Sequence, residues 1–139
     1  MDDILFKDIL DKFNFSEKDI FALNPLILAY IGDAVYEVYV RTMLVHENKV
    51  SVHKLHKLSI EYVKAKSQSD IIHKIMDKLT DEEKDIVRRG RNAKSGTIPK
   101  NADVTEYKYA TGFESLIGYL YLKKQYSRLM EVLEMAIGD

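Results

Sequence analysis

The sequence predicts an all-α domain, and three observations lead to this prediction. Apolar residues recur at intervals of three and four along most of the chain, the spacing of the buried face of a helix. Alternating apolar and polar runs, which would indicate β-strands, are nearly absent. The chain has only two prolines, and one of them, Pro25, stands where a helix can begin. A length of 139 residues suits a single domain covering 1–139.

The expected helices follow one another through short connections. The first covers 4–13, and Ser16 caps a brief second helix, with the acidic Asp19 three positions on. Asn24 caps a long helix over 25–45, the most apolar segment, which we expect at the centre of the fold. The other helices are expected at 51–66, at 69–79, after a capping box that begins at Thr80, at 105–124 and at 127–137.

One sizeable loop interrupts this pattern, between residues 94 and 104. Its sequence, KSGTIPKNADV, carries no helical spacing. Long irregular loops in compact domains tend to be functional. We therefore expect this segment to contribute to a site.

The composition excludes several classes of protein. The chain has no cysteine, which rules out disulfides, thiolate metal sites and a cysteine nucleophile, and which suits a reducing compartment. The acidic start at Asp2 and Asp3 does not match a signal peptide, and every apolar run is too short to span a bilayer. We expect a cytoplasmic protein with no membrane partner. The net charge of −1 argues against nucleic-acid binding unless cations gather locally.

Two acidic residues lie in the middle of strongly apolar helices. Asp33 follows Gly32, and Glu114 lies four residues before Gly118. A glycine inside a helix costs about 1 kcal/mol relative to alanine, so both glycines indicate a close helix–helix approach. Helices crossing there would bring the two carboxylates together, and Mg²⁺ would relieve their repulsion. The pattern alone leaves an alternative, in which each acid pairs with a nearby cation, as Glu37 would with the arginine one turn later.

Cations gather between residues 88 and 100, where no acid occurs. A solvated helix end would explain some of them, because cations favour the carboxyl end of a helix. We favour contact with a nucleic-acid backbone, which Gly90 and Gly96 would let approach closely. Tyr107 and Lys108, just beyond the loop, are weaker candidates. The residues expected to bind this backbone, which the resemblance described next implies to be RNA, are Arg88, Arg89, Arg91, Asn92, Lys94 and Lys100.

Three strings of this sequence resemble the ribonuclease III family. IGDAV at 31–35 resembles the family signature, and FESLIG at 113–118 resembles its second metal-binding helix. Together with RRGRNAK at 88–94, they are most similar to the Mini-ribonuclease III branch of the family. The likeness covers roughly residues 24–122.

The resemblance implies a homodimeric helical bundle that hydrolyses double-stranded RNA with Mg²⁺ and leaves 5′ phosphate ends. It assigns catalytic and metal-binding roles to Asp33 and Glu114. The family holds its metal with four acids, and here Ala29 and Thr111 stand at the other two positions. The number of ions per site therefore stays open. Glu37 and Thr111 could act from outside the ligand set, although a structural ion pair is the favoured interpretation of Glu37.

The resemblance also implies a substrate, the precursor of the large-subunit (23S) ribosomal RNA, and leaves open whether a ribosomal protein assists. The separate RNA-binding domain of full-length ribonuclease III is not expected here, so the catalytic dimer would make the RNA contacts. Two alternatives compete with the nuclease: a non-catalytic ribonuclease III relative that binds structured RNA, and a helical interaction module without an RNA role.

Overall fold

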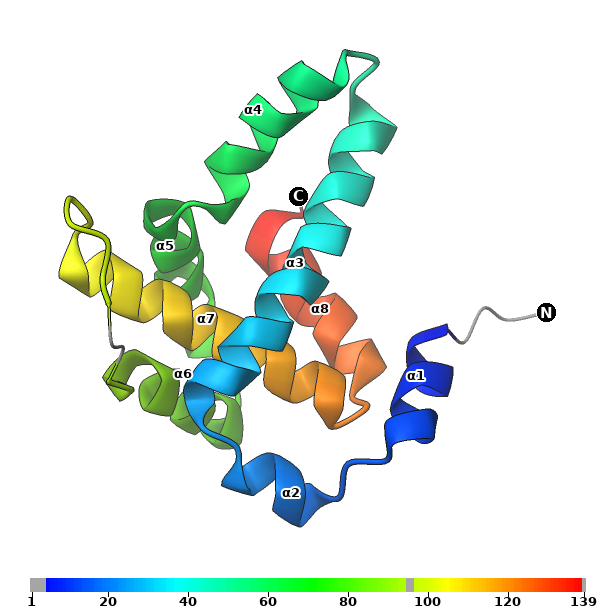
Figure 1. Ribbon diagram of the computed structural model, residues 1–139, viewed down its shortest axis with the longest axis vertical. Coiled ribbons are helices and arrows are strands. Elements are labelled where there is room, and N and C mark those ends of the chain that lie inside the picture. Colours follow the sequence, from blue (N-terminus) through cyan, green and yellow to red (C-terminus); the bar gives the residue numbers. More distant parts are fainter. Residues whose placement is uncertain (1–4, 95–96, 139) are drawn as a thin grey trace.

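The computed structural model describes residues 5–94 and 97–138, and within these ranges it is helical and contains no strand (Figure 1). This confirms the predicted all-α class. No helix in the described part of the chain is both long and apolar enough to cross a membrane. The elements are α1 (Leu5–Phe13), α2 (Glu17–Ala22), α3 (Pro25–Glu47), α4 (Val52–Val63), α5 (Ala65–Ile75), the short 3₁₀ helix η1 (Met76–Lys78), α6 (Asp81–Asn92), α7 (Val104–Leu122) and α8 (Tyr126–Ile137).

The predicted caps form where the sequence placed them. The Ser16 hydroxyl accepts a hydrogen bond of 3.0 Å from the Asp19 amide at the start of α2. The Asn24 side chain accepts one of 2.8 Å from the Leu26 amide at the start of α3. The capping box at Thr80 begins α6. These side chains satisfy amide groups that a helix start leaves without an intrahelical partner, so they fix where each helix begins.

The boundary between α4 and α5 differs from the expected one. Lys64 adopts an extended conformation with φ −66° and ψ 152°, so α4 ends at Val63 and α5 already begins at Ala65. A helix start at Ser69 was therefore wrong, because Ser69 lies inside α5 and is buried. As a result, residue 68 belongs to a helix that packs on α7, and not to a connecting loop.

α7 is the central helix of the fold. It packs against α3, α5 and α6, and Figure 1 shows it crossing α3 with α5 and α6 on its other sides. From residue 110 to residue 122 every side chain of α7 is buried except that of Glu114, which is partly exposed. The long apolar α3 thus shares the centre with α7. The only acid in this stretch of α7 is also its only residue that is not buried.

Candidate active site

The site lies where α3 and α7 cross. A β-carbon added at Gly32 would lie 2.7 Å from the Gly118 nitrogen and would overlap the carbonyl group of Glu114. One added at Gly118 would overlap the carbonyl oxygen of Leu28. Glycine is therefore required at both positions, because the two backbones are in direct contact. The predicted crossing of the helices at their glycines is confirmed.

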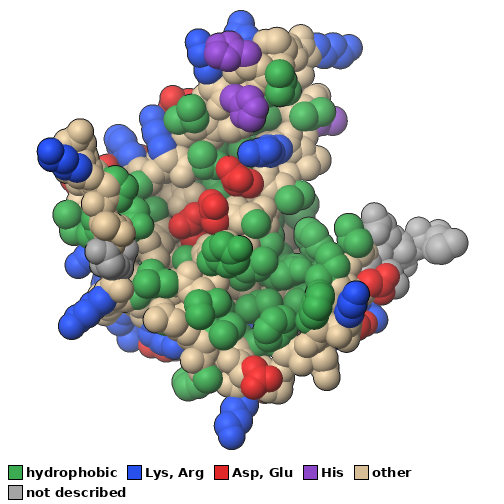
Figure 2. Space-filling model, in the orientation of Figure 1, with side chains coloured by type: hydrophobic (Ala, Val, Ile, Leu, Met, Phe, Trp, Pro, Cys, Tyr) green, Lys and Arg blue, Asp and Glu red, His purple; other side chains and the backbone are tan. Residues whose placement is uncertain are grey.

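This crossing brings Asp33 and Glu114 together. The pKa of Glu114 is raised to about 9, chiefly by burial and then by the neighbouring carboxyl group and charge of Asp33. Glu37 adds a smaller repulsion that also raises this pKa. Asp33 is exposed, and Figure 2 shows acidic side chains gathered over the middle of α3. In the absence of a cation, Glu114 thus keeps its proton near neutral pH, as a buried acid beside a second carboxyl group does.

The donor set suits a hard divalent cation. Two carboxylates that resist joint ionisation are stabilised by a cation placed between them. Among the described residues, no group of three or more histidine, cysteine, aspartate or glutamate side chains gathers in a way that could hold a metal. Mg²⁺ is commonly held by one or two carboxylates, with water and substrate phosphate at its other positions. The pair therefore fits Mg²⁺ and does not fit an ion that requires a complete protein cage.

The two positions where the family has further acids carry no carboxylate. Ala29 is buried on α3. The hydroxyl of Thr111 donates a hydrogen bond of 3.0 Å to the Tyr107 carbonyl, within its own helix. Glu37 forms an ion pair with Arg41, 3.7 Å between Oε2 and Nη2. Glu37 is therefore engaged in the expected structural pair, and it still acts on Glu114 through its charge.

The three arginines of α6 do not form one cluster. Arg88 makes an exposed ion pair within its own helix. Arg89 lies over the ring of Phe21 at 5.4 Å, and Arg91 lies over the ring of Tyr109 at 5.5 Å. Successive helical residues diverge by about 100°, so neighbouring side chains on one helix contact different neighbours.

A hollow of about 440 Å³ lies between the end of α6 and the start of α7. Its lining includes Asn92 and Lys94 from the expected RNA-binding set, Lys108, and Thr111, which precedes Glu114 by one helical turn. Lys100 is exposed on the adjoining loop. Lys108, a weaker candidate from the sequence, is therefore a stronger candidate for RNA binding in the structure, because it lines the same cavity as Lys94.

The two glycines expected to approach phosphate have different outcomes. Gly90 is buried, and a β-carbon there would lie 2.6 Å from the Ser115 hydroxyl and 2.9 Å from the Gly112 α-carbon. That expectation was wrong for Gly90, since the small residue serves the packing of α6 on α7. Gly96 lies outside the described residues.

One polar residue near the acids was missed in the sequence. Gln68 of α5 is 1% exposed, and its amide acts on the Glu114 carboxyl. Its spacing of three and four residues before Ile71 and Ile72, both buried, marks the inward face of the helix. A glutamine on the inward face of a helix is unusual, and this feature of the sequence could have identified Gln68 as a site residue.

Similarity to known proteins shows the family of this chain. The sequence model of the ribonuclease III domain matches residues 26–125. The chain is 51% identical over 122 residues to Mini-ribonuclease 3 of Thermoanaerobacter sp. (strain X514), covering 88% of this chain and 86% of that protein. It is 48% identical over 126 residues to Mini-ribonuclease 3 of Staphylococcus aureus, covering 89% of this chain and 94% of that one.

A crystal structure of a Fusobacterium nucleatum protein superposes with a TM-score of 0.77 at 35% identity. The superposition covers 86% of this chain and 95% of the other. The match to the domain model spans more than half of the chain, and it includes both acids, both crossing glycines and the hollow beside α6. The chain therefore belongs to the ribonuclease III family, in which its relatives are Mini-ribonuclease 3 proteins.

Proposed function

We propose that this endoribonuclease hydrolyses double-stranded RNA at a Mg²⁺ site held by Asp33 and Glu114. The observation that carries the proposal is the pairing of these two carboxyl groups over the glycine crossing of α3 and α7. Two acids kept together in a fold, at a cost in repulsion, are typical of a functional site. Family membership supports duplex RNA as the substrate class.

The chain's own residues would hold and orient the reacting groups. A divalent cation, when bound, makes a water molecule more acidic and offsets charge on the phosphate. Asp33 is exposed, so one of its oxygens can meet a cation that arrives with RNA. Glu114 is held by a helix whose neighbouring residues are buried, so its position is fixed by packing. With two carboxylates in place of four, we expect weaker cation binding that improves when RNA phosphate completes the site.

We propose that duplex RNA contacts the hollow between α6 and α7. Lys94 and Lys108 line it, and Lys100 is exposed nearby. Duplex RNA is bound mainly through phosphates and 2′-hydroxyls, so a few cations beside the paired acids would suffice. Arg88 and Asn92 remain part of this proposed surface. Arg89 and Arg91 would contact RNA from their positions over the rings of Phe21 and Tyr109.

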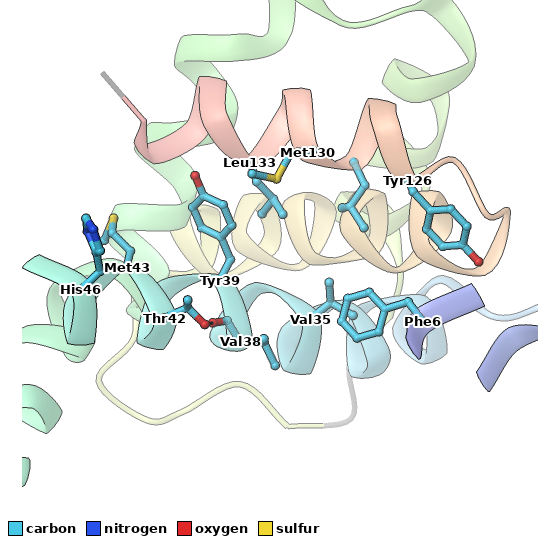
Figure 3. A pocket seen from close by; sticks show the side chains of 11 residues that line it. Phe6, Val35, Val38, Tyr39, Thr42, Met43, His46, Tyr126, Met130 and Leu133 are labelled. Carbon is cyan, nitrogen blue, oxygen red and sulfur yellow. Dashed lines mark hydrogen bonds between the residues drawn. The ribbon is translucent and has the colours of Figure 1, made fainter. Parts of the chain in front are cut away.

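We also propose that the protein is a homodimer. Figure 3 shows side chains of α3, α1 and α8 lining an apolar groove of about 490 Å³, with Phe6, Val38, Tyr39 and Met130 among them. Figure 2 shows a hydrophobic area on the same face as the acidic side chains. An exposed apolar area of this kind marks an interaction surface. A two-fold dimer would carry two equivalent sites, one for each RNA strand.

The biological substrate that we propose is the duplexed precursor of 23S ribosomal RNA, processed in the cytoplasm. This part of the proposal is supported by the likeness to Mini-ribonuclease 3 proteins. The absence of cysteine suits a reducing compartment. Whether a ribosomal protein assists can be tested by adding ribosomal proteins to the cleavage reaction.

One assay tests the nuclease proposal. Labelled duplex RNA is incubated with the protein, with and without Mg²⁺, beside the Asp33→Asn and Glu114→Gln variants. We expect Mg²⁺-dependent cutting that falls by about 100-fold or more in both variants, since several kcal/mol of charge stabilisation is lost. Binding without cutting would favour a non-catalytic RNA-binding relative, and neither binding nor cutting would favour an interaction module.

A further inference from the structure

Gln68 is a polar side chain that the packing of α5 against α7 buries almost completely. It is 1% exposed, and its Nε2 atom makes no hydrogen bond of normal geometry with the described residues. Buried amide donors almost always have a partner, and an unpaired one costs about 1–3 kcal/mol. An apolar side chain of the same length would avoid this cost. A functional role would explain why this position carries an amide.

The position of Gln68 is fixed by contacts among three helices. The Tyr36 hydroxyl of α3 donates a hydrogen bond of 2.9 Å to the Tyr62 carbonyl, close to the α4–α5 junction. The Tyr36 ring also packs edge-on against Phe113 of α7, with ring centres 5.2 Å apart. Phe113 directly precedes Glu114. The start of α5, which carries Gln68, is thus held against the parts of α3 and α7 that carry the acids.

The partner available to this amide is Glu114. The amide of Gln68 acts on the Glu114 carboxyl and lowers its pKa, whereas burial, Asp33 and Glu37 all raise it. This is the effect of a donor on a carboxylate, because the amide favours the ionised form. The contact is not a formed hydrogen bond, since Nε2 has no hydrogen-bond partner among the described residues.

We propose that Gln68 is a positioning residue that donates a hydrogen bond to Glu114 when this carboxylate holds a divalent cation. The inference rests on the proposed function. The amide would hold one carboxylate oxygen and direct the other to the ion. Groups that hydrogen-bond a metal ligand from outside fix its orientation in this way.

The chemistry of glutamine suits this role. A lysine or arginine at position 68 would place a positive charge beside the carboxylate and compete with the cation. An apolar residue would leave the carboxylate without a donor. Orientation also matters more with a small ligand set, and Ala29 and Thr111 supply no carboxylate here. A neutral donor adds order to the site without adding charge.

The first test compares Mn²⁺ binding by calorimetric titration in the unaltered protein, Gln68→Met and Ser69→Ala. Methionine removes the amide and keeps the length of the side chain. We expect Gln68→Met to bind Mn²⁺ roughly tenfold more weakly. Its melting temperature without metal should be equal or higher, because an unpaired buried group is removed. Ser69→Ala changes another buried polar residue of α5 and should bind Mn²⁺ as the unaltered protein does. Equal affinity of Gln68→Met and the unaltered protein would overturn the inference.

The second test needs no change at Gln68 and decides the matter if Gln68→Met does not fold. The side-chain amide signals of Gln68 are followed by NMR while Mg²⁺ is added. We expect them to move in step with binding in the unaltered protein and to stay in place in Asp33→Asn. If the Gln68 signals of the unaltered protein do not move while it binds Mg²⁺, and Asp33→Asn loses that binding, the role of Gln68 is overturned and the proposed metal site is not. A lack of Mg²⁺ and Mn²⁺ binding by the unaltered protein would instead contradict the proposed function.

Discussion

The backbones of Gly32 and Gly118 touch, although 85 residues separate them in the sequence. A β-carbon at Gly32 would lie 2.7 Å from the Gly118 nitrogen, closer than real β-carbons approach other atoms. The atoms in the way belong to the backbone of α7, which cannot rotate aside as a side chain can. This contact sets the distance between the helices that carry Asp33 and Glu114.

Gly32→Ala is therefore expected to destabilise the protein, although alanine is the better helix former. Forcing α3 away from α7 should lower the free energy of unfolding by about 3 kcal/mol, measured by urea denaturation. Ala34→Gly, at an exposed position of the same helix, should cost only about 1 kcal/mol through helix propensity. A Gly32→Ala protein as stable as its parent would show that the helices are not in contact.

The stability of the protein without metal should depend on pH through Glu114. Folding raises the pKa of this carboxyl from 4.5 to about 9, so the folded protein keeps a proton that the unfolded chain has lost. The free energy of unfolding should therefore fall as the pH rises from about 4.5 to about 9. Glu114→Gln keeps the shape of the side chain without its charge, so it should be more stable than the parent at about pH 8. This advantage should disappear towards about pH 5, where the unfolded chain of the parent also begins to take up the proton. Parallel pH profiles of the two proteins would contradict this account.

The apolar groove on α3 gives a test of the dimer. Val38 is 55% exposed, so Val38→Asp should leave the fold of the single chain intact. A charge buried without a partner in a dimer interface should weaken association by about 100-fold or more, measured by sedimentation velocity. Ile60→Asp is a matched control, because Ile60 on α4 is also 55% exposed. Dissociation by both variants, or by neither, would count against the groove as the interface.

The hollow beside α6 predicts a change in the salt dependence of RNA binding. Lys94→Ala and Lys108→Ala should each weaken duplex RNA binding and reduce the slope of log K against log salt by about 1. Lys78→Ala, an exposed lysine in η1, should leave the slope unchanged. Equal slopes in the parent and all three variants would show that RNA does not contact the hollow.

The glycine crossing, the two acids and the helix caps could be predicted from the sequence, because each produces a recognisable pattern among neighbouring residues. A glycine and an acid inside an apolar helix conflict with helix propensity and with burial, so Gly32, Asp33 and Glu114 could be recognised without coordinates. The caps at Ser16 and Asn24 depend only on neighbouring residues, and they appear as expected.

Features that depend on contacts distant in the sequence could not be predicted in the same way. The break at Lys64 has no side-chain cap, and the Tyr36 hydroxyl bond fixes the junction nearby. The helices expected from the sequence therefore leave Gln68 in the connection between them. The directions of Arg89 and Arg91 depend on where Phe21 and Tyr109 lie, and a run of basic residues does not contain that information.

Diffraction from crystals soaked in Mn²⁺ is the most direct test of the metal site, because the anomalous signal locates the ion. The account predicts one strong peak at about 2.0–2.3 Å from a carboxylate oxygen of Asp33 and from one of Glu114. A peak elsewhere, or a peak that touches only one of these residues, would contradict the shared site on which the proposed nuclease depends.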